Sequence, residues 1–377
     1  MNAEKCKSYF GEIEDTRYAP FVDHCLWQVL TLVMCACMCG ISKLDEIVAY
    51  GNEKSKFLRE QFGVETIPSK PTLSRALNAV DGEKVAECVV KIMSDCIGTD
   101  GDIVSFDGKA VRQTYQDERA EKVHIVSAFV TKTGVVLGQK CIPEKTNEIP
   151  VVRDMLDLFN ISGRIITADA MHCQRETVEE IVKRSGDYVI GLKKNQPLFY
   201  NDVEHYFNNT EKTILENDET NEINRGRNEQ RICYKTTDAN LISKYSDWAN
   251  LKAVYVVVRN TTEKSVLSSE TSYYISSLDV SPLRMLEITR EHWKIEAMHN
   301  VLDVSFGEDE GRVLSKNGQI TLNVFRKLSY AMHKNFIEET TKTKTKPSIK
   351  SNMFRALLNN KLIPDILTAV VKTRNIL

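Results

Sequence analysis

Three acidic side chains occupy positions from which they could do chemistry together. Asp107 interrupts the apolar run VSFDGK, Asp169 closes the apolar segment IITAD, and Glu296 lies in EHWKIEAMHNVLD. A lone carboxylate in an apolar strand is costly unless it is paired, hydrogen-bonded or bound to a metal. Two carboxylates at neighbouring strand ends, and a third on a helix packed across them, would form an oxygen-rich pocket for two Mg²⁺ ions.

The chemistry that such a pocket supports is phosphoryl transfer. Two divalent cations ~4 Å apart can activate a water or a sugar hydroxyl and stabilise the leaving oxygen at phosphorus. The chain has 52 acidic residues, so spacing alone does not separate this triad from unrelated surface and capping carboxylates. Both interpretations stay open at this point, and only the placement of the three residues favours the first.

The first 98 residues predict an all-helical domain, because apolar residues recur at helical spacing between glycine breaks. Helices are expected over residues 24–39, 43–50, 53–62, 71–80 and 82–97. Pro68 and Pro71 lead into the fourth of these, which carries Arg75. This segment resembles the second helix of a helix-turn-helix unit, and it equally fits a plain corner of a helical bundle.

The pattern changes at residue 101 and predicts an α/β sheet. Strands are expected at 102–111, twice within 124–142, at 163–171 and at 187–193, with helices at 147–160 and 173–185. This order describes a mixed sheet, which collects ligands at the carboxyl ends of its strands. Residues 208–282 predict a β-rich insertion, in which the polar run ENDETNEINRGRNEQ precedes strands near 229–237, 252–259 and 270–278. A long helix through the 290s follows.

The chain is therefore expected to contain a helical domain, a two-part α/β domain, an insertion and a basic helical tail. The corresponding ranges are 1–98, then 99–207 with 283–337, then 208–282, and finally 338–377. The net formal charge is only −2, but 13 basic and three acidic residues lie from Arg312 onward. That segment could bind an anion, or it could be an ordinary solvated pair of helices.

Other protein classes are excluded by composition and motifs. The ten cysteines lack the paired spacing of a zinc site, and Cys35, Cys37 and Cys39 are expected to pack as buried thiols in a helix. The apolar stretch from Cys25 to Gly40 is shorter than the ~20 residues that span a bilayer. No nucleotide-binding P-loop is present. These features predict a cytoplasmic protein with no membrane segment and no nucleotide cofactor.

Several segments together resemble the DDE transposases of bacterial insertion sequences, specifically the ISAs-type, or H-repeat-associated, group. They occur in family order and cover most of the chain. The segments are FDGKAVR (106–112), KTGVVLGQ, KTNEIP (145–150), ITADAMHCQ (166–174), DYVIGLKKNQ (187–196), YYISSL (273–278) and HWKIEAMHNVLDVSFGEDEGRV (292–313).

The resemblance implies an RNase H-like catalytic fold that is interrupted by a β insertion. It also implies that Asp107, Asp169 and Glu296 form a metal-binding triad for Mg²⁺, with Mn²⁺ able to substitute. Double-stranded DNA is the implied partner, both as terminal inverted repeats and as the target. A homodimer or a higher assembly on paired ends is implied as well.

One signature departs from that of the related hairpin-forming transposases. Those proteins carry Tyr-x2-Arg-x3-Glu-x6-Lys, where this chain has Thr289, His292, Glu296 and Asp303. The hairpin mechanism is therefore not carried over to this chain. Asp303 lies nearly two helical turns after Glu296 and could be a fourth acidic group near the metals, or a solvated or capping residue.

Further residues could contact DNA. Lys109 and Arg112 follow Asp107 and could hold phosphates or form surface salt bridges. His172 could contact a phosphate or pack at a helix N-terminus. Trp293 is expected in the core, and the order H-x3-E-x2-H argues against a zinc site. The remaining candidates for DNA contact are Lys193, Lys194, Asn195, His292, Arg312 and Arg75.

These observations favour a bacterial DNA transposase that acts in the cytoplasm on the nucleoid. Water would attack a phosphodiester at an element end, and the freed 3′ hydroxyl would then attack target DNA. Two alternatives stay open. One is a structure-specific nuclease on the same RNase H-like fold, without strand transfer. The other is a non-catalytic, domesticated DNA-binding relic.

Overall fold

The structure is a computed structural model that describes residues 1–99, 101–111, 123–142, 148–224, 227–263, 266–310, 313, 315–343 and 345–373. Arg112 and Arg312 lie outside the described residues. The chain divides into two compact units. The first, here called the helical unit, comprises Met1–Asp100, Gly108–Asn147 and Glu296–Leu377. The second, the sheet unit, comprises Gly101–Asp107 and Glu148–Ile295.

The helical unit begins with α1 (Ala3–Phe10), a helix that the apolar periodicity did not predict. The helices that it did predict follow: α2 (Leu26–Met38), α3 (Leu44–Glu53), α4 (Ser55–Phe62), α5 (Lys70–Ala79) and α6 (Gly82–Cys96), with a short 3-10 turn at Ala19–Phe21. The Ser69 side chain accepts a hydrogen bond from the backbone of Thr72 and caps α5. Helix α2 is buried along nearly its whole length, and Cys35, Cys37 and Cys39 are buried free thiols, as expected.

The same unit contains the C-terminal helices and a β-hairpin. The helices are α13 (Lys316–Thr340), α14 (Ile349–Leu358) and α15 (Leu362–Thr373), and the hairpin joins β2 (His124–Val130) to β3 (Val136–Ile142). Helix α13 packs against α2, α5, α6, α14 and α15. Because it is central, it buries Arg326 and Lys327. Part of the basic C-terminal segment therefore lies in the interior and not on an anion-binding surface.

The sheet unit is a mixed sheet with flanking helices. Strands β1 (Ile103–Ala110), β4 (Ile165–Ala168) and β5 (Asp187–Leu192) are parallel, and β9 (Val266–Ser276) runs antiparallel to β5. Strands β8 (Ala253–Glu263), β7 (Arg227–Thr236) and β6 (Glu216–Asn224) follow in that order. The helices are α8 (Glu148–Met155), α9 (Arg175–Lys183), α10 (Pro197–Asn209), α11 (Ala239–Lys244) and α12 (Pro282–Phe306).

The strand neighbours are those of an RNase H-like sheet. In the helical unit the order is β3-β2-β1, where the backbone of Val111, just after β1, donates to Val123 O at 3.0 Å. In the sheet unit the order is β1-β4-β5. The expected mixed α/β fold, with helices before and after it, is confirmed. Within the part of the chain that the structure describes, the helices are too short or too polar to traverse a bilayer.

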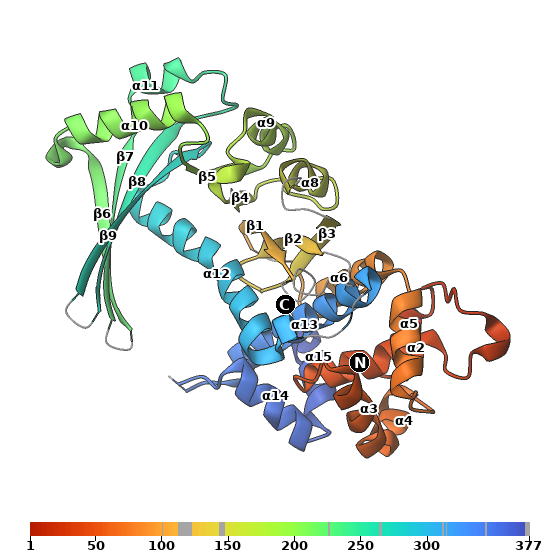
Figure 1. Cartoon of the computed structure of the whole chain (residues 1–377). Helices are drawn as coiled ribbons and strands as arrows, with labels where there is room; N and C mark the ends of the chain where they lie inside the picture. The colour runs from red at the N-terminus through yellow and green to blue at the C-terminus, as the bar shows by residue number, and fades with distance from the viewer. Residues whose placement is uncertain are drawn as a thin grey trace. The chain divides into compact units, whose positions relative to one another are not determined.

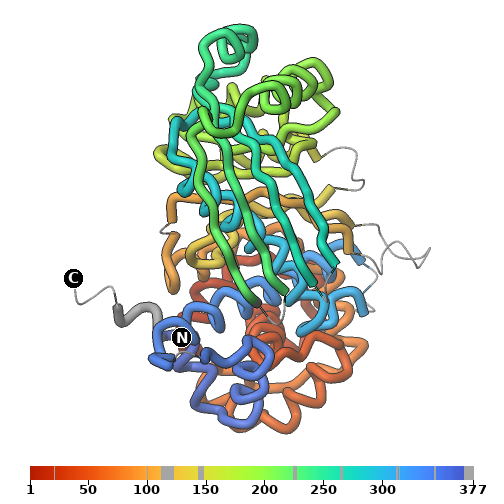
Figure 2. The backbone as a smooth tube through the Cα atoms, turned by 90° about the vertical axis from the view of Figure 1, so that its left-hand side faces the viewer, coloured from red at the N-terminus to blue at the C-terminus, as the bar shows by residue number. Residues whose placement is uncertain are grey.

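Strands β6 to β9 form a long ribbon, and Figures 1 and 2 show them side by side. The run ENDETNEINRGRNEQ was expected to be a polar lead-in, but this is wrong, because it forms β6 and the start of β7. Polar side chains pair across neighbouring strands there; for example, Lys235 Nζ lies 2.7 Å from Glu216 Oε2. A ribbon that is stabilised by such cross-strand pairs shows no apolar alternation in its sequence.

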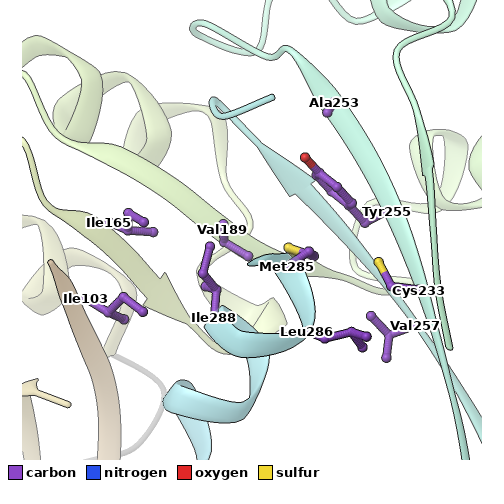
Figure 3. Packing of buried hydrophobic residues seen from close by; sticks show 10 residues of the cluster. All are labelled: Ile103, Ile165, Val189, Cys233, Ala253, Tyr255, Val257, Met285, Leu286 and Ile288. Carbon is purple, nitrogen blue, oxygen red and sulfur yellow. The ribbon is translucent and has the colours of Figure 1, made fainter. Parts of the chain in front are cut away.

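The first turns of α12 pack on the face of the sheet. Figure 3 shows Ile288 of α12 beside Val189 of β5, and Met285 of α12 lies in the same buried cluster, together with Ile103 of β1 and Ile165 of β4. These five side chains are almost entirely buried. Full burial of such a side chain contributes roughly 1.5–3 kcal/mol. This packing fixes how α12 crosses β1 and β4, and therefore which side chains it presents at their ends.

Candidate active site

Asp107 and Asp169 lie at corresponding positions of two neighbouring parallel strands. The register pairs Ser105 with Thr167 and Phe106 with Ala168. The next residue along the chain is Asp107 in β1 and Asp169 after β4, so the two residues lie side by side. Adjacent strands are only ~4.8 Å apart. Asp107 is half-buried, whereas Asp169 is exposed just beyond the end of β4. The two carboxylates that the sequence predicted for one sheet edge therefore occur at that edge together.

Both carboxylates face the side of the sheet that α12 covers. Alternate residues of a strand share a face, so Asp107 goes with Ser105 and Asp169 with Thr167. The Ser105 and Thr167 hydroxyl oxygens lie 2.8 Å apart, which shows that this face is common to both strands. Thr167 Oγ1 also lies 2.9 Å from Nδ1 of His292, a residue of α12.

His292 joins this hydroxyl pair to the Asp169 carboxylate. Its Nε2 lies 3.5 Å from Asp169 Oδ1, on the opposite side of the ring from the nitrogen near Thr167. The interaction with His292 lowers the pKa of Asp169, against the effect of desolvation, and Lys193 and His172 add to the lowering. Asp169 is thereby held in the ionised form that a cation requires. His292 was a candidate for DNA contact, and in this structure its ring lies beside Asp169.

The end of β5 supports the loop that follows Asp169. Asn195 Nδ2 donates a hydrogen bond to Ala170 O at 2.7 Å, and Gln196 Nε2 donates to Cys173 O at 2.9 Å. Asn195 thus stabilises the loop, although it was a candidate for DNA contact. Lys193 and Lys194 are exposed at the same strand end.

Glu296 lies on α12 one helical turn after His292. Residues four apart share a face of a helix, so Glu296 lies on the face that His292 uses. Its side chain is exposed. The division into units falls just before it, so Glu296 belongs to the helical unit. Among the described residues no three His, Cys, Asp or Glu side chains are gathered in a form ready to hold a metal ion.

A buried ionic cluster in the helical unit ties the end of β1 to α12. Lys109 forms ion pairs with Asp303 and with Glu308, whose Oε2 lies 2.7 Å from Lys109 Nζ. Glu308 also accepts hydrogen bonds from Asn323 Nδ2 at 2.8 Å and from Arg326 Nη1 at 3.2 Å. Burial opposes ionisation of Glu308, but Lys109 and Arg326 lower its pKa to about 2.

This cluster shows what Lys109 and Asp303 contact in the structure. The salt bridge proposed for Lys109 exists, and it is largely buried, with 13% of the side chain exposed. Asp303 is its partner, so in this structure both side chains are engaged in an ion pair. Glu308 was not predicted from the sequence. Glu308 lies in the acidic segment GEDEGRV. The sequence does not indicate which acidic residue of this segment is buried.

The other candidates lie elsewhere. His172 is only 1% exposed and its Nε2 lies 3.8 Å from Glu148 Oε1, so packing is the role that its position supports. Arg75 is exposed on α5, where it donates a hydrogen bond to Thr72 Oγ1. Trp293 was expected in the core, and this is wrong: it is 39% exposed, and the Arg259 guanidinium lies 4.5 Å from its ring centroid.

The chain matches known protein families over most of its length. The family model described as "Transposase DDE domain" matches residues 98–332, and the model described as "DDE_Tnp_1-associated" matches residues 7–93. "H repeat-associated putative transposase YhhI" of Escherichia coli K12 is 32% identical over 84% of this chain and 87% of its own length. "Putative transposase YncI" of Escherichia coli O157:H7 is 30% identical over 87% of each chain. Among solved structures, a piggyBac transposase synaptic complex with hairpin DNA matches with a TM-score of 0.44 and 10% identity, covering 99% of this chain and 78% of its own.

Proposed function

The chain belongs to the transposase DDE-domain family, and from this premise we propose that it cleaves DNA at the ends of an insertion sequence and joins them to target DNA. Asp107, Asp169 and Glu296 would hold Mg²⁺, for which Mn²⁺ could substitute. The observation that supports this most is the side-by-side placement of Asp107, within β1, and Asp169, just after the end of β4. The place of action would be the bacterial cytoplasm, on the nucleoid.

The residues present fit a hard divalent cation. Carboxylate oxygens are the ligands that Mg²⁺ prefers, and such ions would activate the attacking oxygen and neutralise the leaving one. Asp169 is kept ionised by its contact with His292. Thr167 holds the other nitrogen of that ring, so the imidazole keeps a fixed orientation towards Asp169. His292 is thus a positioning residue in this proposal.

The assignment of Glu296 to the triad comes from the family resemblance of the segment 292–313 and from the position of Glu296 on α12. On α12, His292, Glu296 and Asp303 lie within about 40° of one another around the helix axis. His292 bonds to Thr167, the partner of Ser105, and Asp303 bonds to Lys109. Ser105 and Lys109 stand two residues before and after Asp107. Glu296 thus lies on the same face of α12 as His292, which contacts Asp169.

DNA would reach this site over exposed basic side chains. Lys193 and Lys194 lie at the end of β5, next to the loop after Asp169. We expect them to contact the phosphate backbone, and Arg75 of α5 is the candidate in the helical unit. Such binding should weaken steeply with salt, because each phosphate contact releases counterions. A dimer or a higher assembly on paired ends is part of the same proposal.

A cleavage and joining assay tests the proposal. The purified full-length protein is incubated with Mg²⁺ or Mn²⁺ and a duplex that carries the element's own end. We expect 3′-end cleavage and joining, and we expect D107N, D169N and E296Q to lose both while they still bind DNA. Asp247→Asn, an exposed carboxylate of the sheet unit that pairs with Arg175, is the matched control. Undiminished cleavage by the triad variants would refute the assignment.

The same assay separates the two alternatives. Cleavage without joining would favour the structure-specific nuclease. Specific binding of the end without any cleavage, in Mg²⁺ and in Mn²⁺, would favour the non-catalytic relic. The intact pair of carboxylates, Asp107 within β1 and Asp169 just after β4, favours the transposase over the relic.

A further inference from the structure

A hollow of about 380 Å³ in the sheet unit is lined by three arginines, Arg227, Arg259 and Arg290, together with Trp293 and three glutamates. Arg227 and Arg259 come from β7 and β8 of the ribbon, and Arg290 and Trp293 come from α12. We propose that this arginine pocket binds a backbone phosphate of the DNA on which the protein acts. The inference rests on the proposed function, because that function supplies the ligand.

One largely buried carboxylate lies at the centre of the pocket. Glu229, with 12% of its side chain exposed, receives Arg231 Nε at 2.7 Å and Arg259 Nε at 3.1 Å. Arg290 Nη1 and Arg227 Nη2 approach the same carboxylate at 3.3 and 3.4 Å. Each guanidinium has five N–H donors, whereas a carboxylate accepts about four hydrogen bonds. Four arginines therefore present many more donors than Glu229 can satisfy.

The other carboxylates around the pocket are well solvated. Glu222 pairs with Arg290, and Glu270 lies 3.5 Å from Arg259 Nη1; their side chains are 48% and 68% exposed. Glu263, at the end of β8, also lines the hollow. Ion pairs with such exposed partners are weak, since water screens them. A phosphate, which an arginine binds through two parallel hydrogen bonds, can compete with them for the arginines.

Unsatisfied donors are present beside the same carboxylate. Arg231 is only 6% exposed, yet its Nη2 has no hydrogen-bond partner among the described groups. In the lining itself, the buried Nε of Arg227 also has none. A buried donor without an acceptor costs free energy, and a ligand oxygen would remove that cost. The unpaired donors thus point to an acceptor that binds from outside the chain.

The pocket lies one helix face away from the candidate active site. Arg290 and Trp293 flank His292 on α12, and His292 contacts Asp169. The two positions are therefore separated by about the ~10 Å diameter of a helix. A strand whose scissile phosphate lies at Asp107 and Asp169 would bring a nearby phosphate of its backbone to this pocket.

Binding of a duplex that carries the element end tests the pocket. Fluorescence anisotropy is measured over a range of salt with D107N protein, so that cleavage does not interfere. Adding Arg290→Gln should weaken binding by roughly tenfold and reduce the slope of log affinity against log salt by about one. Arg290→Lys keeps the charge but not the planar guanidinium, so its DNA affinity should lie between that of D107N alone and that of D107N with Arg290→Gln. The matched control is Arg284→Gln, on the same helix and paired with Asp102 and Glu287, which should bind as D107N alone does.

The outcomes separate this inference from the proposed function. If Arg290→Gln and Arg259→Gln both keep the affinity and the salt slope while the wild type cleaves DNA, the pocket is refuted and the function stands. If the wild type never cleaves DNA but the arginine variants bind it more weakly, the function is refuted and the pocket stands. Thermal unfolding of each variant is measured alongside, and the comparison uses variants that unfold as the parent does.

Discussion

His292 Nε2 lies 3.5 Å from Asp169 Oδ1, while Nδ1 of the same ring lies 2.9 Å from Thr167 Oγ1. The imidazole thereby links a residue within β4 to the carboxylate just beyond the end of that strand. In the proposed site its task is to hold Asp169 ionised and correctly oriented. This task is distinct from DNA contact, and it can be tested as such.

Replacing His292 should weaken the metal dependence of the reaction more than the binding of DNA. For His292→Asn we expect cleavage to fall 10- to 100-fold and the Mg²⁺ concentration for half-maximal rate to rise, as for other partners of metal ligands. DNA affinity should change little. The Mg²⁺ dependence of single-turnover cleavage checks this. The control is His205→Asn, an exposed histidine of α10. A loss of DNA affinity equal to the loss of rate would contradict a positioning role.

Lys109 should act through its ion pairs and not through a phosphate. Its ammonium group contacts Asp303 and Glu308 and is largely buried. Lys109→Met should therefore reduce cleavage at least tenfold, because the end of β1 loses its tie to α12, while the salt dependence of DNA binding stays unchanged. Anisotropy titrations over a range of salt measure that slope. A slope that falls by about one would instead show that Lys109 contacts a phosphate.

Glu308 should make the protein sensitive to acid. Its folded-state pKa of about 2 lies below the ordinary value of 4.5. The stabilisation is therefore fully present above pH 4.5 and is lost as the pH falls towards 2, by on the order of 3 kcal/mol. Glu308→Gln should be less stable at pH 7 and should lose less stability on acidification. Urea unfolding at several pH values measures this, with the exposed Glu339→Gln as the control.

Lys327 should make the protein more stable as the pH rises into the alkaline range. It is fully buried, and desolvation lowers its pKa to about 7, although Glu308 opposes this. Below pH 7 the charge is carried in the folded state at a cost. Between pH 7 and 10.5 the folded protein releases the proton that the unfolded chain keeps, so stability rises with pH. Lys327→Met should remove this rise, whereas the exposed Lys361→Met should keep it. Denaturant unfolding from pH 6 to 10 distinguishes the two.

The local elements could be predicted because their signals are local. Apolar spacing and capping residues place α2 to α6 within about three residues of the observed bounds. The apolar runs that end at Asp107 and Asp169 predicted their common sheet edge, since parallel strands end together. Strand β6 was missed because it is stabilised by pairs with β7, and a polar strand with a distant partner resembles a loop in the sequence.

The burial of individual charged and aromatic side chains could not be predicted from the sequence. It determines which of these residues form ion pairs in the interior and which are exposed. Lys109, Glu308 and Lys327 are ordinary surface types, yet each lies inside the helical unit. Trp293 belongs to a usually buried type, yet it is exposed beside arginines. Which side chain is buried depends on what packs against it from remote parts of the chain.

The sequence by itself determined the family of this protein and the order of most of its elements, and it singled out three carboxylates as the proposed triad, because each of these depends on residue type and near neighbours. Only the tertiary structure decided that His292 contacts Asp169, that Lys109 binds Asp303 and Glu308, and that four arginines share Glu229. Most of these contacts join residues that lie far apart in the chain, although Arg227 and Arg231 are each two residues from Glu229. Most of them are charged pairs whose strength depends on desolvation. Desolvation arises only when the chain has folded around them.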